Sequence, residues 1–288
     1  MFNFEFSVIK YRFEALSSFT TPYFLGSTFR GILGRKLKKI VCIKPGTECQ
    51  VCEFRMTCPY TVIFETESFL NKPSRYIMRP PFEKKELQEG DSLELEITLL
   101  GETANYWEFI SQAFAGILNL GKDRYLKTVG MEFYHPFEGI YYPVKSFIPR
   151  FEAYHFLEFI TGQKKLDIKI YPTSIKFGGE FVSYKTFNKE TLIKAIVSRI
   201  SVVANHYGLK TGKIFIDPSA IELENLKTRA VPMKRWSNRK KTHMVIPAFE
   251  AEFTISGEIN AIYPYMTTVE LINLGKSVSF GLGRIDIL

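Results

Sequence analysis

LDIKIYPTSI, residues 166–175, is the stretch at which the pattern of the chain begins again. Apolar side chains at Leu166, Ile168 and Ile170 alternate with polar ones, which is the period of a half-buried β-strand. A strand of the same kind, residues 2–14, opens the chain. The stretch therefore predicts the first strand of a second domain.

Each half of the chain offers the same order of elements, namely strand, helix, strands, helix and strand. In the first half we expect strands 2–14 and 91–100, helices 27–41 and 104–120, and short strands within 121–150. In the second half we expect strands 166–175, 243–256 and 284–287 and helices 188–207 and 264–274. This order is the split βαβ, or ferredoxin-like, arrangement. We predict an α+β protein with tandem ferredoxin-like domains, residues 1–163 and 164–288.

Composition and charge narrow the function classes. Of 288 residues, 45% are apolar, which suffices for packed cores, and no apolar run is long enough to span a bilayer. The N-terminus reads as a strand and not as a signal peptide, so we expect a cytoplasmic protein without membrane partners. Lys and Arg outnumber Asp and Glu by 38 to 30, which favours a polyanionic partner, RNA or DNA, or an acidic membrane surface. Many basic proteins bind nothing anionic, so charge alone leaves this open.

The four cysteines are concentrated in one segment with the spacing C-x6-C-x2-C-x5-C; they are Cys42, Cys49, Cys52 and Cys58. Four thiolates this close in sequence can hold a structural zinc ion or an iron–sulfur cluster, and the spacing does not choose between them. Disulfides are disfavoured in the cytoplasm. The alternative is four thiols without a ligand. Because four thiolates leave no open position on a tetrahedral metal, any metal here would be structural.

Residues 227–243, KTRAVPMKRWSNRKKTH, form the densest basic run of the chain. Cations around one aromatic side chain suit contacts of this loop with phosphates and stacking on a base, although a solvated hairpin loop has the same composition. Near the C-terminus, the segment 275–284 is rich in glycine, which lets backbone approach a phosphate closely. The expected RNA-binding residues are Lys234, Arg235, Trp236, Arg239, Lys240, Lys241, Gly275, Lys276, Gly281, Gly283 and Arg284.

Three segments together resemble one family, the CRISPR-associated RNA-processing endoribonucleases of the RAMP superfamily. They are FRGILG at 29–34 with the following basic helix and cysteines, KRWSNRK at 234–240, and LGKSVSFGLGR at 274–284. The resemblance spans most of the chain. It implies tandem ferredoxin-like, RRM-like domains, a repeat-containing precursor RNA as substrate, and a glycine-rich loop that packs against RNA.

The implied reaction needs no metal, because a ribose 2′-OH attacks the adjacent phosphorus and leaves a 2′,3′-cyclic phosphate and a 5′-OH. Relatives often carry histidine on the first helix, whereas this chain has Arg35 after Gly34. Arginine stabilises charge but is not a base near neutral pH. The expected catalytic residues are Arg35, Lys39, Tyr23 and His243, with Arg35 and the neighbouring lysines steadying the transition state and Tyr23 or His243 handling a proton. An unremarkable role for His243 stays open.

Two other functions remain open at this stage. The missing early histidine fits a non-catalytic RNA-binding subunit of a CRISPR effector complex, so subunits of such a complex are expected partners beside the repeat RNA. A metal-cluster protein whose cysteines do redox work is the more distant option. The sequence leaves homodimerisation open.

Overall fold

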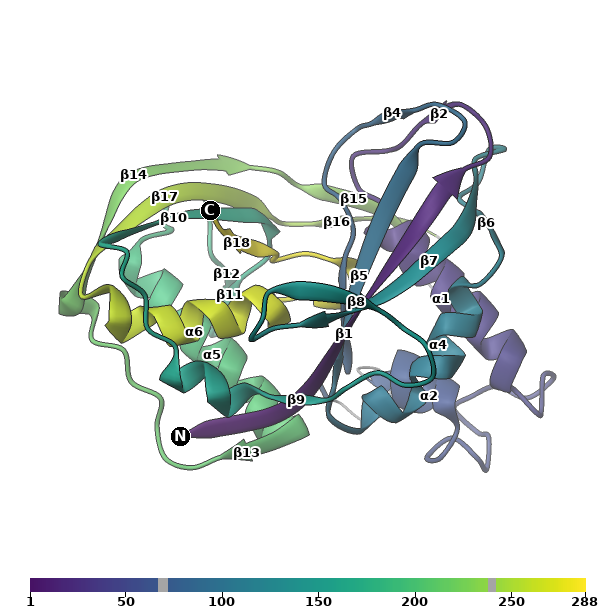
Figure 1. Cartoon of the computed structure of the whole chain (residues 1–288), viewed down its shortest axis with the longest axis horizontal. Helices are drawn as coiled ribbons and strands as arrows, with labels where there is room; N and C mark the ends of the chain where they lie inside the picture. Colours follow the sequence, from purple (N-terminus) through teal and green to yellow (C-terminus); the bar gives the residue numbers. More distant parts are fainter. Residues whose placement is uncertain (67–71, 238–241) are drawn as a thin grey trace. The chain divides into compact units, whose positions relative to one another are not determined.

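The computed structural model of the chain describes residues 1–66, 72–237 and 242–288. The chain divides into two compact units (Figure 1). The N-terminal unit comprises residues 5–151, and the C-terminal unit comprises residues 152–288 together with residues 1–4. The division thus falls between Phe151 and Glu152, and the first strand contributes residues to both units.

The N-terminal unit is built on β1 (Phe2–Ala15), α1 (Gly26–Val41), β3 (Tyr76–Arg79), β5 (Ser92–Leu100), α4 (Trp107–Phe114) and β7 (Tyr125–His135). These strands lie in the order β3-β5-β1-β7, and every neighbouring pair is antiparallel. Numbered by their place in the βαββαβ unit, the order is 2-3-1-4, which is the ferredoxin-like topology.

Shorter elements complete the N-terminal part: β2 (Phe19–Thr20), α2 (Pro59–Phe64), β4 (Glu86–Leu87), η1 (Gly101–Tyr106), β6 (Ile117–Asn119), β8 (Ile140–Pro143) and β9 (Phe151–Glu152). β6 and β8 extend the sheet by pairing with β7, while β2 pairs with β4.

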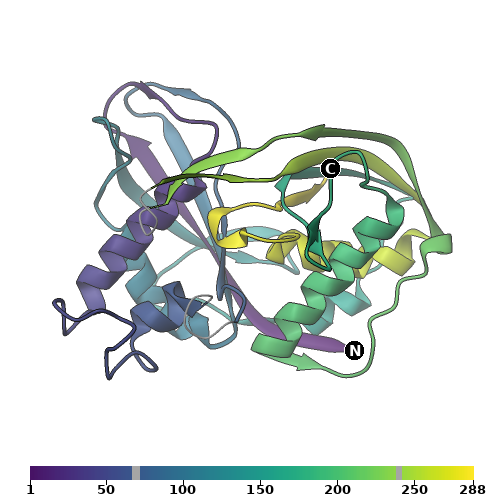
Figure 2. The ribbon, with the colours of Figure 1, turned by 180° about the vertical axis from the view of Figure 1, so that it is seen from behind.

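The C-terminal unit repeats the plan with β10 (Lys165–Thr173), α5 (Lys189–Tyr207), β14 (Ile221–Ala230), β17 (Phe249–Gly257), α6 (Ile259–Ile272) and β18 (Ile285–Ile287). Its sheet has the order β14-β17-β10-β18, again 2-3-1-4 and antiparallel throughout. α5 and α6 lie along one face of this sheet (Figure 2). The predicted class, α+β with tandem ferredoxin-like domains, is confirmed.

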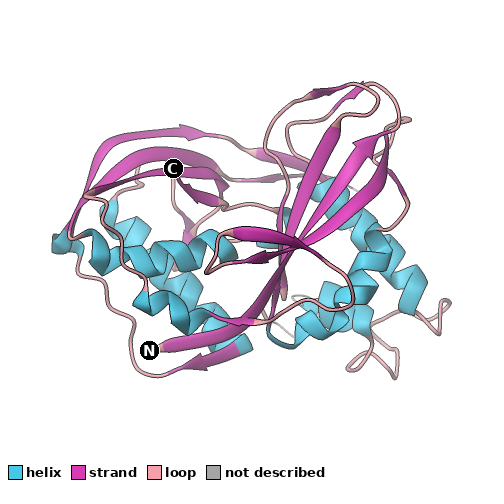
Figure 3. Ribbon diagram, in the orientation of Figure 1, coloured by secondary structure: helices cyan, strands magenta, loops and turns pink. Residues whose placement is uncertain are grey.

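The remaining elements of the C-terminal unit are η2 (Ala153–Glu158), β11 (Lys176–Phe177), β12 (Glu180–Phe181), β13 (Gly208–Lys210), η3 (Pro218–Ala220), β15 (Met233–Ser237), β16 (Thr242–Ile246) and η4 (Val278–Phe280). β11 pairs with β12, β15 with β16, and β13 with the beginning of β1. Figure 3 shows how helix and strand alternate through both units.

Local sequence accounts for the main elements. The alternation in β1 buries Phe2, Phe4 and Phe6, each at most 2% exposed, and so fixes which face of the strand meets a core. On α1, Phe29, Leu33 and Leu37 are fully buried and form the apolar stripe expected from their spacing. α5 begins with a capping box, in which Asn188 accepts from the Thr191 N–H at 2.9 Å.

Three of the predicted helices and strands have different bounds in the structure. The helix expected at 104–120 ends at Phe114, because Gly116 takes a left-handed φ of +71° and the chain then forms β6. The helix expected to start at Pro264 begins at Ile259, so Pro264 lies inside α6. The strand expected at 243–256 is divided into β16 and β17, with Pro247 between them.

Across the described ranges 1–66, 72–237 and 242–288, we find no helix whose length and hydropathy would let it traverse a bilayer.

Candidate nucleic-acid interface

Described residues on both sides of 238–241 lie in two paired strands, β15 and β16, where the composition of the basic run predicts a loop. β15 and β16 are antiparallel, with Lys234 opposite Val245 and Trp236 opposite His243. Lys234 and His243 are exposed, whereas Met233 is 3% exposed and anchors the hairpin. The predicted RNA-binding residues Arg239, Lys240 and Lys241 lie outside the described residues. The hairpin therefore presents Lys234 and His243 to solvent beside a buried anchor.

Arg235 connects this hairpin with the glycine-rich segment 275–284. Its guanidinium carbon lies 4.6 Å from the centre of the Phe280 ring, and its Nη2 donates to the Met244 sulfur at 3.7 Å. Phe280 belongs to η4, inside the glycine-rich segment. A guanidinium stacked on an aromatic ring holds both groups in a defined place. The two segments that the sequence marked for RNA binding are thus brought together within one unit.

The glycines of segment 275–284 allow parts of the protein to approach one another. A Cβ added at Gly283 would lie 1.8 Å from the Leu274 carbonyl oxygen, and one at Gly275 would lie 2.4 Å from the Ser174 carbonyl oxygen. Gly283 also has a φ of +80° and Gly281 a φ of +92°. Glycine is required at Gly275 and Gly283 for packing within the protein, so a contact of these glycines with RNA stays a prediction.

Backbone N–H groups in this segment already donate to carbonyl groups. The Gly283 N–H donates to Pro172 O at 2.9 Å, the Gly281 N–H to Val278 O at 2.9 Å, and the Lys276 N–H to Ser174 O at 2.8 Å. Lys276 itself is exposed. Contacts with a polyanion are therefore better assigned to side chains such as Lys276 than to these amides.

Arg284 is half-buried at the end of the segment and makes a bidentate ion pair with Asp286, both distances being 2.8 Å. It also lies 4.8 Å from the centre of the Tyr171 ring. Burial, followed by the nearby Asp286 carboxylate, raises the pKa of the Tyr171 hydroxyl. The predicted RNA-binding residue Arg284 thus also has a structural role.

Arg199 binds the backbone just before the glycine-rich segment. The sequence does not predict this role. It lies on the buried face of α5, is 6% exposed, and donates through Nη2 to Ile272 O at 2.8 Å and through Nε to Asn273 O at 3.1 Å. These carbonyls end α6 immediately before the segment. An arginine among the apolar positions of α5 is the signal that could have identified it.

Several polar atoms next to the segment are buried without a partner. Ser174 Oγ, Ser279 Oγ and Asn273 Oδ1 have no hydrogen-bond partner within the described part of the chain. Their residues are at most 2% exposed. Buried polar groups are ordinarily hydrogen-bonded, so these three atoms are exceptions in the packing around the segment.

In the N-terminal unit, α1 presents two of the predicted catalytic residues on one exposed face. Arg35 and Lys39 are both exposed and lie one helical turn apart, so they are neighbours on the helix surface. Arg35 turns back over Gly31, where an added Cβ would lie 3.3 Å from its Nη1. Two cations in this position can bind one phosphate group.

Other basic residues of α1 are engaged within the protein. The Lys36 ammonium donates to Ala115 O at 3.1 Å and Ile117 O at 3.2 Å, and burial lowers its pKa. Arg30 lies 4.1 Å from the centre of the Phe64 ring and donates to the Tyr76 hydroxyl. Of these cations, Arg35 and Lys39 are therefore the better candidates for substrate contact.

The two proton-handling candidates lie in different units. Tyr23 is half-buried ahead of α1, with its ring 6.2 Å from that of Phe82. His243 is exposed on β16 of the C-terminal unit. Tyr23, Arg35 and Lys39 thus belong to the N-terminal unit, and His243 belongs with the basic hairpin.

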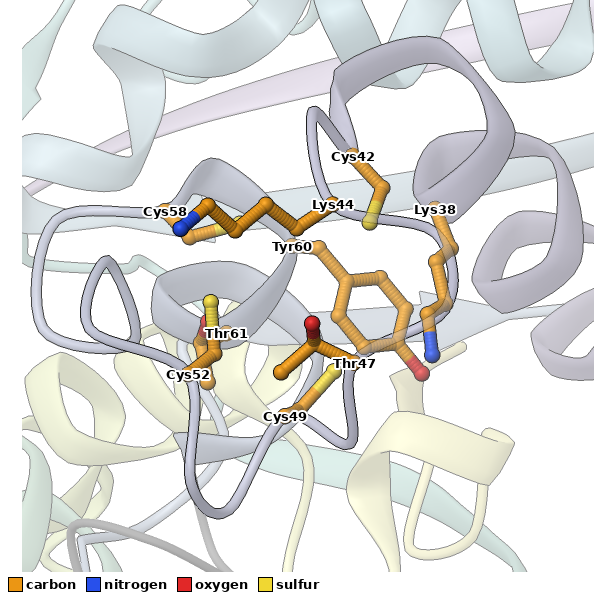
Figure 4. Close-up of a pocket in the computed structure, with 9 residues that line it drawn as sticks. All are labelled: Lys38, Cys42, Lys44, Thr47, Cys49, Cys52, Cys58, Tyr60 and Thr61. Atoms are coloured by element: carbon orange, nitrogen blue, oxygen red, sulfur yellow. The ribbon is translucent and has the colours of Figure 1, made fainter.

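The four cysteines line one pocket, as their clustering predicts (Figure 4). The other lining residues are Lys38, Lys44, Thr47, Tyr60 and Thr61. All four thiols are unpaired and half-buried. As placed, no three His, Cys, Asp or Glu side chains in the described ranges are close enough to one another to hold a metal ion. The segment gathers the thiols without bringing them to ligand distance, and metal binding stays a prediction.

Residues 169–285 match the family model of the CRISPR-associated endoribonuclease Cas6, and residues 4–133 match a model described as an N-terminal domain. No curated protein matches the chain.

Solved structures share the fold at low identity. A Cas6 chain in a product complex is 13% identical, with a TM-score of 0.58, 98% of this chain covered and 99% of that one. A Cas6 chain in a substrate-mimic complex is 10% identical, with a TM-score of 0.53 and 99% of both chains covered. A chain of a partial Cas6-RT-Cas1–Cas2 complex is 14% identical, with a TM-score of 0.61 over 99% of this chain.

The chain spans 46% of the length of that last relative. The structural matches establish a shared fold along nearly the whole chain, while the Cas6 model covers the unit that carries the basic hairpin and the glycine-rich segment. The predicted resemblance is confirmed: residues 169–285 match the Cas6 endoribonuclease model, and solved Cas6 structures share the fold of the chain.

Proposed function

We propose that this protein binds the repeat RNA of a CRISPR precursor transcript in the cytoplasm and cuts it into guide RNAs without a catalytic metal. The observation that carries the proposal is the Cas6 endoribonuclease match at residues 169–285. It falls on the unit in which Arg235 joins the basic hairpin to the glycine-rich segment. A net charge of +8 favours an RNA partner.

The RNA-binding side chains follow from exposure. Lys234 and Lys276 are exposed. Arg235, next to Lys234 in the chain, is held against the Phe280 ring of the glycine-rich segment. In this proposal these cations contact phosphates. Stacking of a base on Trp236 stays a prediction from the sequence, because the side chain of Trp236 lies outside the described part of the structure. The hairpin and the glycine-rich segment hold the repeat, and sequence readout comes from contacts to unpaired bases.

The reaction is a transesterification within the RNA. The 2′-oxygen forms a bond to the adjacent phosphorus, the bond from phosphorus to the 5′-oxygen breaks, and the products carry a 2′,3′-cyclic phosphate and a 5′-OH. The 2′-OH proton passes to a base, and an acid supplies a proton to the departing 5′-oxygen. Arg35 and Lys39 stabilise the negative charge that develops on the phosphorane oxygens. Tyr23 and His243 are the candidates for proton transfer.

A second function has one observation in its favour. The first helix has Arg35 at the position after Gly34, and no histidine precedes His135 in the chain. An RNA-binding subunit of a CRISPR complex that holds RNA without cutting it needs no such base. Two of the structural relatives are chains of Cas6-RT-Cas1–Cas2 complexes, which makes other CRISPR proteins reasonable partners for either function.

The experiment is incubation of the purified protein with end-labelled repeat RNA from its own CRISPR array, beside an RNA of scrambled sequence. Native gels measure binding, and denaturing gels measure cleavage. We expect selective binding and one cut within the repeat. Selective binding without any cut would favour the RNA-holding subunit, and equal binding to both RNAs would contradict repeat recognition.

A further inference from the structure

The cysteine segment, residues 42–58, has almost no core of its own. All residues of this range are described. Its half-buried residues are the four cysteines and Thr47, and the others are exposed. Its apolar side chains face solvent, with Val51 76% exposed, Ile43 73% and Met56 63%. A segment of this length that buries so little apolar surface needs another source of order.

The cysteine side chains converge on the interior of the segment. Figure 4 shows the thiols of Cys42, Cys49, Cys52 and Cys58 directed toward a common space beside the Tyr60 ring. This cavity measures about 20 Å³, which is room for one guest the size of a water molecule. A single ion is a guest of this size.

Regular elements hold the two outer cysteines. Cys42 follows the last residue of α1 and donates its N–H to Lys38 O at 3.0 Å. Cys58 precedes the first residue of α2 and donates its N–H to Phe54 O at 2.8 Å. The inner pair, Cys49 and Cys52, lies in tight turns, where the Arg55 N–H donates to Cys52 O at 3.1 Å. As placed, the thiols are not yet at ligand distance, so a four-thiolate shell requires them to move toward the common space.

We propose that Cys42, Cys49, Cys52 and Cys58 bind one zinc ion as a closed tetrahedral thiolate site that fastens residues 42–58 to α1 and α2. The thiols release their protons when the metal binds, and the zinc tetrathiolate keeps a net charge of −2. Lys38 and Lys44 line the same pocket; Lys38 offsets part of that charge, while Lys44 also pairs with the Glu53 carboxylate. With all four positions taken by sulfur, the ion is structural and takes no part in RNA cleavage.

The first test is the metal content of the full-length protein, purified under reducing conditions with its affinity tag removed. Mass spectrometry of metals should find about one zinc per chain. Cys42→Ser and Cys52→Ser should each reduce zinc to near zero. Thr47→Ala is the matched control, because Thr47 lines the pocket without a thiol. Full zinc retention by both cysteine variants would overturn the proposal.

A second measurement does not depend on whether the variants fold. Wild-type protein is stripped of metal and titrated with Co²⁺, which should yield the visible and thiolate-to-metal absorption bands of a tetrahedral thiolate site and saturate at about one equivalent. Iron–sulfur absorbance in the protein as purified, or four freely reactive thiols with no bound metal, would contradict a zinc site. Zinc content and RNA cleavage are measured separately. A failure of the zinc proposal can therefore be told apart from a failure of the proposed RNA cleavage.

Discussion

Arg35 is the residue on which the proposed chemistry depends most. Replacement by Ala removes an exposed cation from α1 without opening a core. We predict that Arg35→Ala lowers the single-turnover cleavage rate by about 10²–10³-fold, the loss typical of one transition-state contact, with little change in RNA affinity. Rapid-quench kinetics at saturating protein, together with filter binding, measures the two quantities.

Lys127→Ala is the matched control for Arg35, because Lys127 is an exposed cation of the same unit that we assign no role in catalysis. We expect Lys127→Ala to cut RNA at the wild-type rate and Arg35→Lys to recover part of the lost rate. A wild-type rate for Arg35→Ala would remove this residue from the mechanism.

Gly283 carries a steric prediction. An alanine Cβ there would meet the Leu274 carbonyl oxygen at 1.8 Å in a left-handed conformation. We expect Gly283→Ala to lower the free energy of unfolding by at least about 3 kcal/mol, strain and steric overlap together, measured by urea denaturation. Gly179→Ala is the control, because its φ is also positive but nothing lies within 4 Å of the added Cβ. It should cost only the conformational strain of about 1–2 kcal/mol. Equal losses would refute the steric explanation.

At the scale of single residues, the sequence identified residue types better than their contacts. It marked Gly283 and Arg284 for RNA, but not that Gly283 accommodates Leu274 or that Arg284 pairs with Asp286. It also missed Arg199, whose role depends on the end of α6 lying against α5. Such contacts join residues far apart in the chain, and local pattern does not contain them.

At the scale of elements, we expect the β15–β16 strand pair to bind RNA through contacts between its cations and phosphates. Lys234→Ala removes one exposed cation from β15. Each phosphate contact with single-stranded RNA contributes about 0.7 to the salt dependence of binding. We predict that Lys234→Ala weakens RNA binding. The slope of log K against log salt is negative, and the variant should make it less steep by about 0.7. Fluorescence anisotropy over a range of salt concentrations measures both quantities.

Lys165→Ala is the control for Lys234. Lys165 is an exposed cation in the same unit, at the start of β10, and pairs with Glu224 at 2.6 Å. It should leave the salt slope unchanged. An identical fall in slope for both variants would mean that net charge, and not the hairpin, governs binding.

Most elements could be predicted from the sequence because their signals are local. Alternation defined β1, and the apolar stripe defined α1. The basic run was expected as a loop because charged residues hide the strand alternation, and its pairing with residues 242–246 is a tertiary fact. Pro264 was placed at a helix start by the usual preference. In the structure, its carbonyl instead accepts from the hydroxyls of Thr267 and Thr268 inside α6.

At the scale of the whole molecule, β1 belongs to both units. Phe2 and Phe4 are each 2% exposed in the C-terminal unit, where Phe2 pairs with Lys210 and its ring lies 6.2 Å from that of Tyr265. We predict that Phe2→Ala costs about 3–5 kcal/mol and lowers amide protection in α5 and α6. Hydrogen exchange read by mass spectrometry measures this effect, and Phe2→Leu should cost much less. Loss of protection confined to residues 5–151 would contradict the assignment of Phe2.

The duplicated plan of the molecule was predictable, since strand and helix signals recur in the same order in both halves. The strand order 2-3-1-4 follows once each half is taken as ferredoxin-like. The sequence does not predict that residues 1–4 belong to the C-terminal unit. β1 reads as one continuous alternating strand, and β13, Gly208–Lys210, is too short to be recognised as its pairing strand.

Cleavage of the repeat RNA in the presence of EDTA, with a matched RNA that carries a 2′-deoxy sugar at the mapped cut, tests the central claim most directly. The account predicts that the ribose RNA is cut at an unchanged rate in EDTA and yields a 2′,3′-cyclic phosphate, while the deoxy RNA binds equally well and stays intact. Cleavage of the deoxy RNA, or loss of all cleavage when divalent metal is removed, would contradict it.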